Sequence, residues 1–195
     1  MTAEVRVVIV DDHPVVRQGL RTFLAVQEGI DVVGEAGDGA EAVAMVRTLT
    51  PDVVLLDLVM PGLDGVAAIA QLTAESPDTR VLVLTSFPDD DKLLAAVQAG
   101  AAGYLLKDVA PAELASAIRA VARGEAALSS RPAARLLREY AQGGSAAGPV
   151  AGLFMRLPQG KSELRNAWSA RNSMEAASFG KLTGVGLEND MFRPS

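Results

Sequence analysis

Short apolar runs alternate with amphipathic stretches along the first 125 residues of the chain. The five runs are Val5–Val10, Ile30–Ala36, Asp52–Asp57, Arg80–Thr85 and Gly103–Leu106. Runs of this length that are apolar on both faces are typical of strands buried within a parallel sheet. We therefore expect five parallel strands.

The stretches between these runs repeat their apolar residues at helical spacing. Val16, Leu20, Phe23 and Leu24 follow at i, i+4, i+7 and i+8 behind Pro14, which is tolerated at a first helical position. Further helices are expected after Asp38, after Gly65, after the acidic run Asp89–Asp91, and from Pro111 to Gly124. Right-handed crossovers then place helices on both faces of the sheet, which predicts an α/β fold, a doubly wound (βα)₅ unit over residues 1–125.

Acidic, hydroxyl and amine side chains stand where these strands end. Asp11 and Asp12 close the first strand, Asp57 the third and Thr85 the fourth, and Lys107 follows the fifth. Because the carboxyl ends of parallel strands meet at one edge, we expect these groups to lie together. Two like charges about 4 Å apart cost roughly 4 kcal/mol at an effective dielectric near 20, so clustered carboxylates hold a proton or recruit a cation. Mg²⁺ suits such a group, and the sequence predicts a Mg²⁺ and phosphoryl site.

Each of these residues also has a simpler explanation when taken alone. Paired acids after a strand are often loop residues or a helix cap, Lys107 beside an aspartate is typical of a surface ion pair, and Thr85 is a common type of strand residue. Their joint placement at successive strand ends favours the site. The single histidine, His13, is interpreted as a loop or capping residue next to a helix start and not as a phosphorylated histidine.

The charge is uneven along the chain. Residues 1–125 carry 9 Lys and Arg against 19 Asp and Glu, a net charge of −10, whereas residues 126–195 carry 9 against 5, a net charge of +4. The acidic first part disfavours nucleic acid. The weakly basic second part is compatible with DNA contact, but the same charge is equally typical of a solvated tail, and we favour the tail.

Several classes of protein are disfavoured by composition. The chain has no cysteine, so it has neither a disulfide framework nor a thiolate metal site. It has no long uncharged apolar run, and its first residues belong to an expected strand and not to a signal peptide. We therefore expect a cytoplasmic protein without a membrane partner.

Four segments together resemble the receiver domain of bacterial two-component response regulators. They are VDDHPVVRQGL, DVVLLDLVMPGLDG, VLVLTS and AGAAGYLLKD, and they occur in the expected order and at the expected separations. The first and last are most similar to the subfamily that usually carries a LuxR/FixJ-type helix-turn-helix output domain. The resemblance covers residues 5–125 and implies that a partner sensor histidine kinase phosphorylates Asp57.

The resemblance also implies a role for each site residue. Mg²⁺ would be bound directly by Asp12, Asp57 and the backbone carbonyl of Val59, and by Asp11 mainly through water. Asp57 would then be the nucleophile towards a phosphohistidine. In this scheme the protein catalyses only its own Mg²⁺-dependent phosphorylation and dephosphorylation, and we do not expect an enzyme with a separate substrate.

Further residues stabilise or report the phosphorylated state in this family. Lys107 would supply positive charge and Thr85 a hydroxyl hydrogen bond to the phosphoryl group. Tyr104 would follow Thr85 as a conformational switch, although a tyrosine that buries its ring and hydrates its hydroxyl is equally common. Val59 and Phe87 are apolar and would screen attacking water, which predicts slow self-dephosphorylation.

The chain after residue 125 is less informative. Residues 126–149 are expected to be a linker with a short helix carrying Leu136, Leu137 and Tyr140, followed by a flexible hinge. Residues 150–195 lack the threonine-proline-arginine-glutamate opening and recognition helix of the subfamily's output domain. A partial apolar stripe occurs only in Ser162–Ala177. We expect a disordered or degenerate output segment, and its origin by truncation or frame alteration stays open.

Two functions remain open. One is a phosphorylation-controlled regulator of transcription that binds DNA, which is supported by family analogy only. The other is a receiver that acts through protein contacts or as a phosphate sink without DNA. A metal-dependent phosphatase is disfavoured because it typically has a second acid two residues after its nucleophile, where this chain has Val59. A homodimer is a further open option, through the exposed faces of the first or fifth helix or through the face of helix four, strand five and helix five. No residue in the sequence decides among these surfaces.

Overall fold

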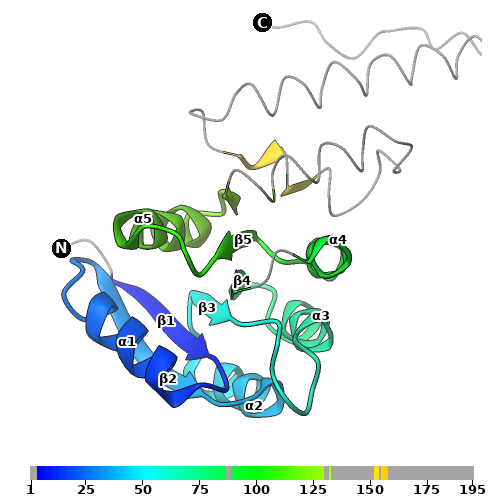
Figure 1. The fold of residues 1–195 in the computed structure, drawn as a ribbon, viewed down its shortest axis with the longest axis horizontal. Helices are drawn as coiled ribbons and strands as arrows, with labels where there is room; N and C mark the ends of the chain where they lie inside the picture. Colours follow the sequence, from blue (N-terminus) through cyan, green and yellow to red (C-terminus); the bar gives the residue numbers. More distant parts are fainter. Residues whose placement is uncertain (1–3, 87–88, 130–131, 133–151, 154, 158–195) are drawn as a thin grey trace, which may run out of the picture.

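Six parallel strands form one sheet. The computed structural model describes residues 4–86, 89–129, 132, 152–153 and 155–157 (Figure 1). The strands are β1 (Val5–Val10), β2 (Ile30–Ala36), β3 (Val53–Leu56), β4 (Arg80–Thr85), β5 (Gly103–Leu106) and β6 (Ala127–Leu128). Their order is β2-β1-β3-β4-β5-β6. The five predicted strands are confirmed, although β3 is shorter than predicted, since it begins after Asp52 and ends before Asp57. The short strand β6 was not predicted, because two residues show no periodicity.

Five helices connect the strands. They are α1 (Pro14–Leu24), α2 (Gly39–Leu49), α3 (Gly65–Glu75), α4 (Asp90–Gln98) and α5 (Pro111–Ala122). The Asp38 carboxylate accepts the Glu41 N–H at 2.8 Å and so caps α2, and Asp89 caps α4 in the same way. The five predicted helices are confirmed, including the proline starts of α1 and α5. Two boundaries differ from the prediction, because α4 begins at Asp90, inside the acidic run, and α5 ends at Ala122, before Gly124.

The sheet separates two apolar clusters, one on each face. Successive residues of β1 alternate between them: Val8 and Val10 pack with α2, α3 and α4, whereas Val7 and Ile9 pack with α1 and α5. Figure 1 shows these helices in two layers around the sheet. Burial on both faces explains why the strands read as continuous apolar runs, and it leaves the strand ends as the place for polar chemistry.

Part of the segment 152–157 packs on the sheet edge next to β6. Leu153 and Leu157 are 0% and 2% exposed and belong to the same cluster as Tyr104 and Leu128. The backbone N–H of Ala126 donates to the Arg156 carbonyl at 2.7 Å. The predicted linker helix and the stripe in Ser162–Ala177 lie outside the described residues, as does Phe87. Within the described part, no helix is both long and apolar enough to cross a bilayer.

Candidate functional site

The predicted polar residues meet at the carboxyl edge of the sheet. The ladder continues just past two strands, since the N–H of Asp57 donates to the Val10 carbonyl at 2.9 Å and that of Lys107 donates to the Thr85 carbonyl at 2.8 Å. Asp11 and Asp57 are 2% and 5% exposed. Strand pairing thus brings residues from three separate parts of the chain to one edge.

The ammonium group of Lys107 bridges two buried carboxylates. Its Nζ lies 2.5 Å from Oδ2 of Asp11 and 2.6 Å from Oδ2 of Asp57. Burial is the largest single influence on Lys107 and disfavours its charge, but the hydrogen bonds and charges of Asp11 and Asp57 outweigh it and raise the lysine pKa above its ordinary value. Lys107 is therefore cationic at neutral pH and offsets the repulsion between the two acids.

The second oxygen of Asp57 is held by the backbone that follows it. Oδ1 accepts the Val59 N–H at 3.1 Å. The carboxylate therefore has one oxygen on Lys107 and one on the loop before α3, which sets its orientation. The side chain of Val59 is 39% exposed beside it.

A group of potential metal ligands lies next to this bridge. Ligand atoms of Asp11, Asp12 and His13 lie within 4.8 Å of one another, whereas Asp57 does not belong to the group. Nδ1 of His13 lies 2.7 Å from Oδ1 of Asp12. Oδ1 of Asp12 is buried and accepts no hydrogen bond from the described residues, so this short contact is not a hydrogen bond.

This donor set fits a hard divalent cation. Two carboxylates, a third nearby on Asp57 and a buried oxygen that lacks a donor are what Mg²⁺ would satisfy. The sequence interpretation of His13 was incomplete. It occupies the position before α1, but its side chain makes no capping bond and turns towards the acids.

Thr85 and Tyr104 lie on one face of the sheet. Tyr104 pairs with Val83, and Thr85 is two residues after Val83 on β4, so both side chains point to the side of α4. Each is 1% exposed. The tyrosine ring is thus inside the apolar cluster, and its hydroxyl oxygen is buried as well. The interpretation in which the ring is buried and the hydroxyl is hydrated therefore does not describe Tyr104 in this structure.

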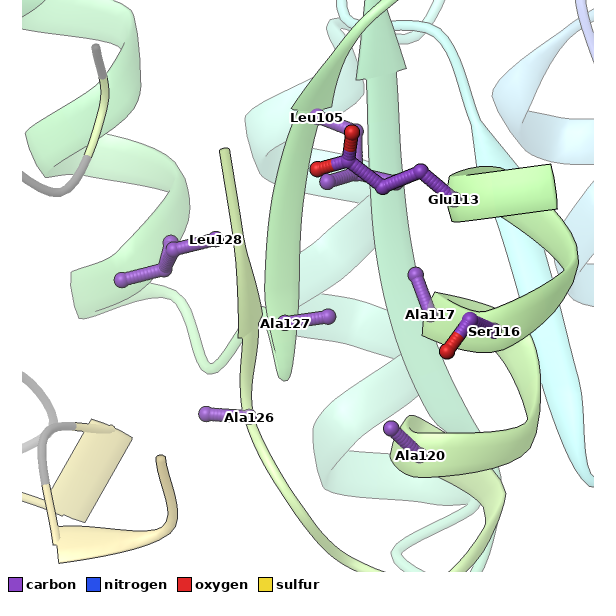
Figure 2. A pocket seen from close by; sticks show the side chains of 8 residues that line it. All are labelled: Leu105, Glu113, Ser116, Ala117, Ala120, Ala126, Ala127 and Leu128. Carbon is purple, nitrogen blue, oxygen red and sulfur yellow. The ribbon is translucent and has the colours of Figure 1, made fainter. Parts of the chain in front are cut away.

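The structure also has a pocket between α5 and the edge strands β5 and β6 (Figure 2). Its volume is about 120 Å³, and its lining includes Glu113, Ser116 and Ala120 of α5 with Ala127 of β6. Pockets for small molecules usually measure about 300–1,000 Å³. None of the predicted site residues lines it, so it does not compete with the carboxyl edge as the functional site.

Comparison with known proteins agrees with this geometry. A family model described as the response regulator receiver domain matches residues 7–119. The chain is 47% identical over 152 residues to the transcriptional regulatory protein LiaR of Bacillus subtilis, covering 78% of this chain and 72% of LiaR. It is 42% identical over 149 residues to the DNA-binding transcriptional activator DevR/DosR of Mycobacterium tuberculosis, covering 76% of this chain and 69% of that relative.

A solved structure is also similar. The receiver domain of the response regulator NarL from Mycobacterium tuberculosis superposes with a TM-score of 0.61 at 41% identity, over 63% of this chain and 99% of that one. Some curated relatives are matched over a smaller share of their length, such as 58% for VraR of Staphylococcus aureus. The similarity is therefore strongest for the receiver part.

Proposed function

Because the chain belongs to the response regulator receiver family of two-component systems, we propose that Asp57 accepts a phosphoryl group from a sensor histidine kinase. The observation that carries the proposal is the orientation of Asp57, whose two oxygens contact Lys107 and the Val59 N–H. A nucleophile whose orientation is already fixed loses less freedom when it reaches the in-line geometry of phosphoryl transfer, which supports the proposal.

In the proposed reaction, an Asp57 oxygen forms a bond to phosphorus while the bond from phosphorus to the kinase imidazole breaks. Lys107 then moves its hydrogen bond from the carboxylate to a phosphoryl oxygen, and the Thr85 hydroxyl donates to another. Mg²⁺ held by Asp11, Asp12, Asp57 and the Val59 carbonyl would offset the negative charge of the transferring group. The change at Thr85 would bias the position of Tyr104 and so the output.

The proposal is tested with the full chain, Mg²⁺ and a small phosphoryl donor such as phosphoramidate. Intact-mass spectrometry should show one added phosphoryl group in the wild type and none in Asp57→Asn. Asp31→Asn is a matched control, since Asp31 is an exposed aspartate on β2 away from the site. Persistent phosphorylation of the Asp57→Asn variant, or none in the wild type, would contradict the proposal.

By similarity to LiaR and DevR/DosR, we further propose that the output is regulation of transcription in the cytoplasm, with DNA as a partner. A second candidate, a receiver that acts through protein contacts or a homodimer, is favoured by the missing helix-turn-helix opening in residues 150–195. Hydrogen exchange of the full chain with Mg²⁺ and beryllofluoride separates the two. Protection in 158–195 that changes with beryllofluoride supports an output domain, and immediate exchange in both states supports the receiver alone.

A further inference from the structure

The guanidinium group of Arg17 contacts the backbone of the acidic loop. Its Nη1 donates to the Asp11 carbonyl at 2.6 Å, in a partly buried position. Arg17 lies on the first turns of α1, and its Nε is 3.8 Å from Oε2 of Glu35 on β2. The side chain therefore connects the loop after β1 to the neighbouring strand.

The hydrogen bond from Arg17 to the Asp11 carbonyl also restrains the backbone of Asp12. The Asp11 carbonyl and the Asp12 N–H belong to one planar peptide group, so a bond that holds the oxygen also holds the direction in which Asp12 leaves the strand. The Asp11 side chain has its own anchors, since it accepts hydrogen bonds from Lys107 and from the His13 N–H at 2.8 Å. Oδ1 of Asp12 accepts no hydrogen bond from the described residues, and its neighbour is Nδ1 of His13 at 2.7 Å.

We propose that Arg17 is a positioning residue for the metal site: by holding the Asp11–Asp12 peptide it orients the Asp12 carboxylate for a divalent cation. The inference rests on the proposed function, because it concerns the same site. Groups that orient metal ligands typically change metal affinity 10–100-fold when they are removed. Mg²⁺ demands near-ideal geometry, so it is sensitive to a misdirected ligand.

An electrostatic effect would have the opposite sign. Arg17 is a cation near a cation site, so loss of its charge alone would tighten metal binding. Glu35 pairs with it and reduces that effect. The direction of the change in affinity therefore distinguishes positioning from charge.

Arg21 provides a matched control. It lies one turn further along α1 and pairs with the same acid, at 2.7 Å from Nη1 to Oε1 of Glu35. Within the part of the chain that the structure describes, the Asp11 carbonyl accepts its side-chain hydrogen bond from Arg17, whereas Arg21 donates to Glu35. Arg21→Met thus removes a charge and a Glu35 pair but leaves the loop contact.

The experiment measures Mn²⁺ binding to the full chain by electron paramagnetic resonance of the free ion, with Mg²⁺ as competitor. We expect Arg17→Met to weaken binding about tenfold, Arg17→Lys to fall between it and the wild type, because lysine can keep one bond to the carbonyl, and Arg21→Met to match the wild type. Phosphorylation of Arg17→Met should recover at saturating Mg²⁺, because the nucleophile is unchanged.

Three results would overturn the inference: wild-type affinity in Arg17→Met, tighter binding in that variant, or equal weakening in Arg21→Met. If Arg17→Met does not fold, as judged by circular dichroism, Arg17→Lys decides by the same criteria. If the wild type binds no Mn²⁺, the proposed function falls together with this inference. If the wild type is phosphorylated normally and Arg17→Met binds Mn²⁺ as tightly as the wild type does, only the positioning role is refuted.

Discussion

The Nζ atom of Lys107 lies 2.6 Å from Oδ2 of Asp57, a contact between residues 50 positions apart in the chain. The same ammonium group also bonds Asp11, so a single cation bridges two buried carboxylates and compensates part of their charge. Phosphoryl acceptance and apoprotein stability therefore depend on the same side chain, which leads to the first two predictions.

Lys107→Met should destabilise the metal-free protein by about 3 kcal/mol, because removal of one partner leaves buried charge uncompensated. Mg²⁺ should restore more stability to this variant than to the wild type, since the ion replaces the lost cation. Urea unfolding with and without Mg²⁺ measures both effects. Arg80→Met, an exposed change at the start of β4, serves as control and should show neither effect.

The free energy of unfolding should also fall at alkaline pH, because Lys107 then loses its charge. Its pKa is raised in the folded protein, so its contribution is fully present below the ordinary lysine pKa of about 10.4 and is lost as pH rises through the higher folded-state value. The free energy of unfolding of the wild type should therefore fall more steeply above pH 10 than that of Lys107→Met. Parallel curves for the two proteins would contradict this prediction.

Gly65, the first residue of α3, should not tolerate a side chain. A Cβ there would lie 2.7 Å from Cα and 2.9 Å from the carbonyl oxygen of Leu58, which follows Asp57. Gly65→Ala should cost about 3 kcal/mol through overpacking and should slow phosphorylation, because the loop behind Asp57 must shift. Gly62→Ala is the comparison: its φ of +87° is strained but the space is open, so only about 1 kcal/mol is expected. Chemical denaturation and phosphorylation rates check both variants.

The burial of Leu153 and Leu157 against the receiver core should contribute to its free energy of unfolding. Leu153→Ala and Leu157→Ala should each cost about 2–4 kcal/mol, since both side chains are buried against the core. Met155, 59% exposed in the same segment, is the matched control, and its change to alanine should cost less than about 0.5 kcal/mol. Denaturation midpoints that are equal for all three would show that the segment does not pack.

The phosphorylated form should be long-lived, because the apolar Val59 beside Asp57 offers no group to position attacking water. Decay of the phosphorylated form, followed by mass spectrometry, should be faster in Val59→Asn than in the wild type. Val26→Asn, at another exposed valine, should decay like the wild type. A wild-type half-life of seconds would refute the prediction.

Local patterns predicted much of the fold and the membership of the site. The cap at Asp38, the proline starts at Pro14 and Pro111 and the five apolar runs all lie where the structure has the corresponding elements. They could be predicted because caps, strand ends and periodicity depend on neighbours in the chain. Strand β6 and the burial of Leu153 could not, because both depend on an edge that exists only after β5 is in place.

The sequence by itself determined that two adjacent acids, Asp57, Thr85 and Lys107 would share one edge, since every parallel strand directs its carboxyl end the same way. Only the tertiary structure decided how those groups pair. Lys107 reaches both Asp11 and Asp57, His13 turns towards the acids, and Arg17 holds the Asp11 carbonyl. These contacts depend on side-chain rotamers and on distances set by the crossovers, which no periodicity along the chain encodes.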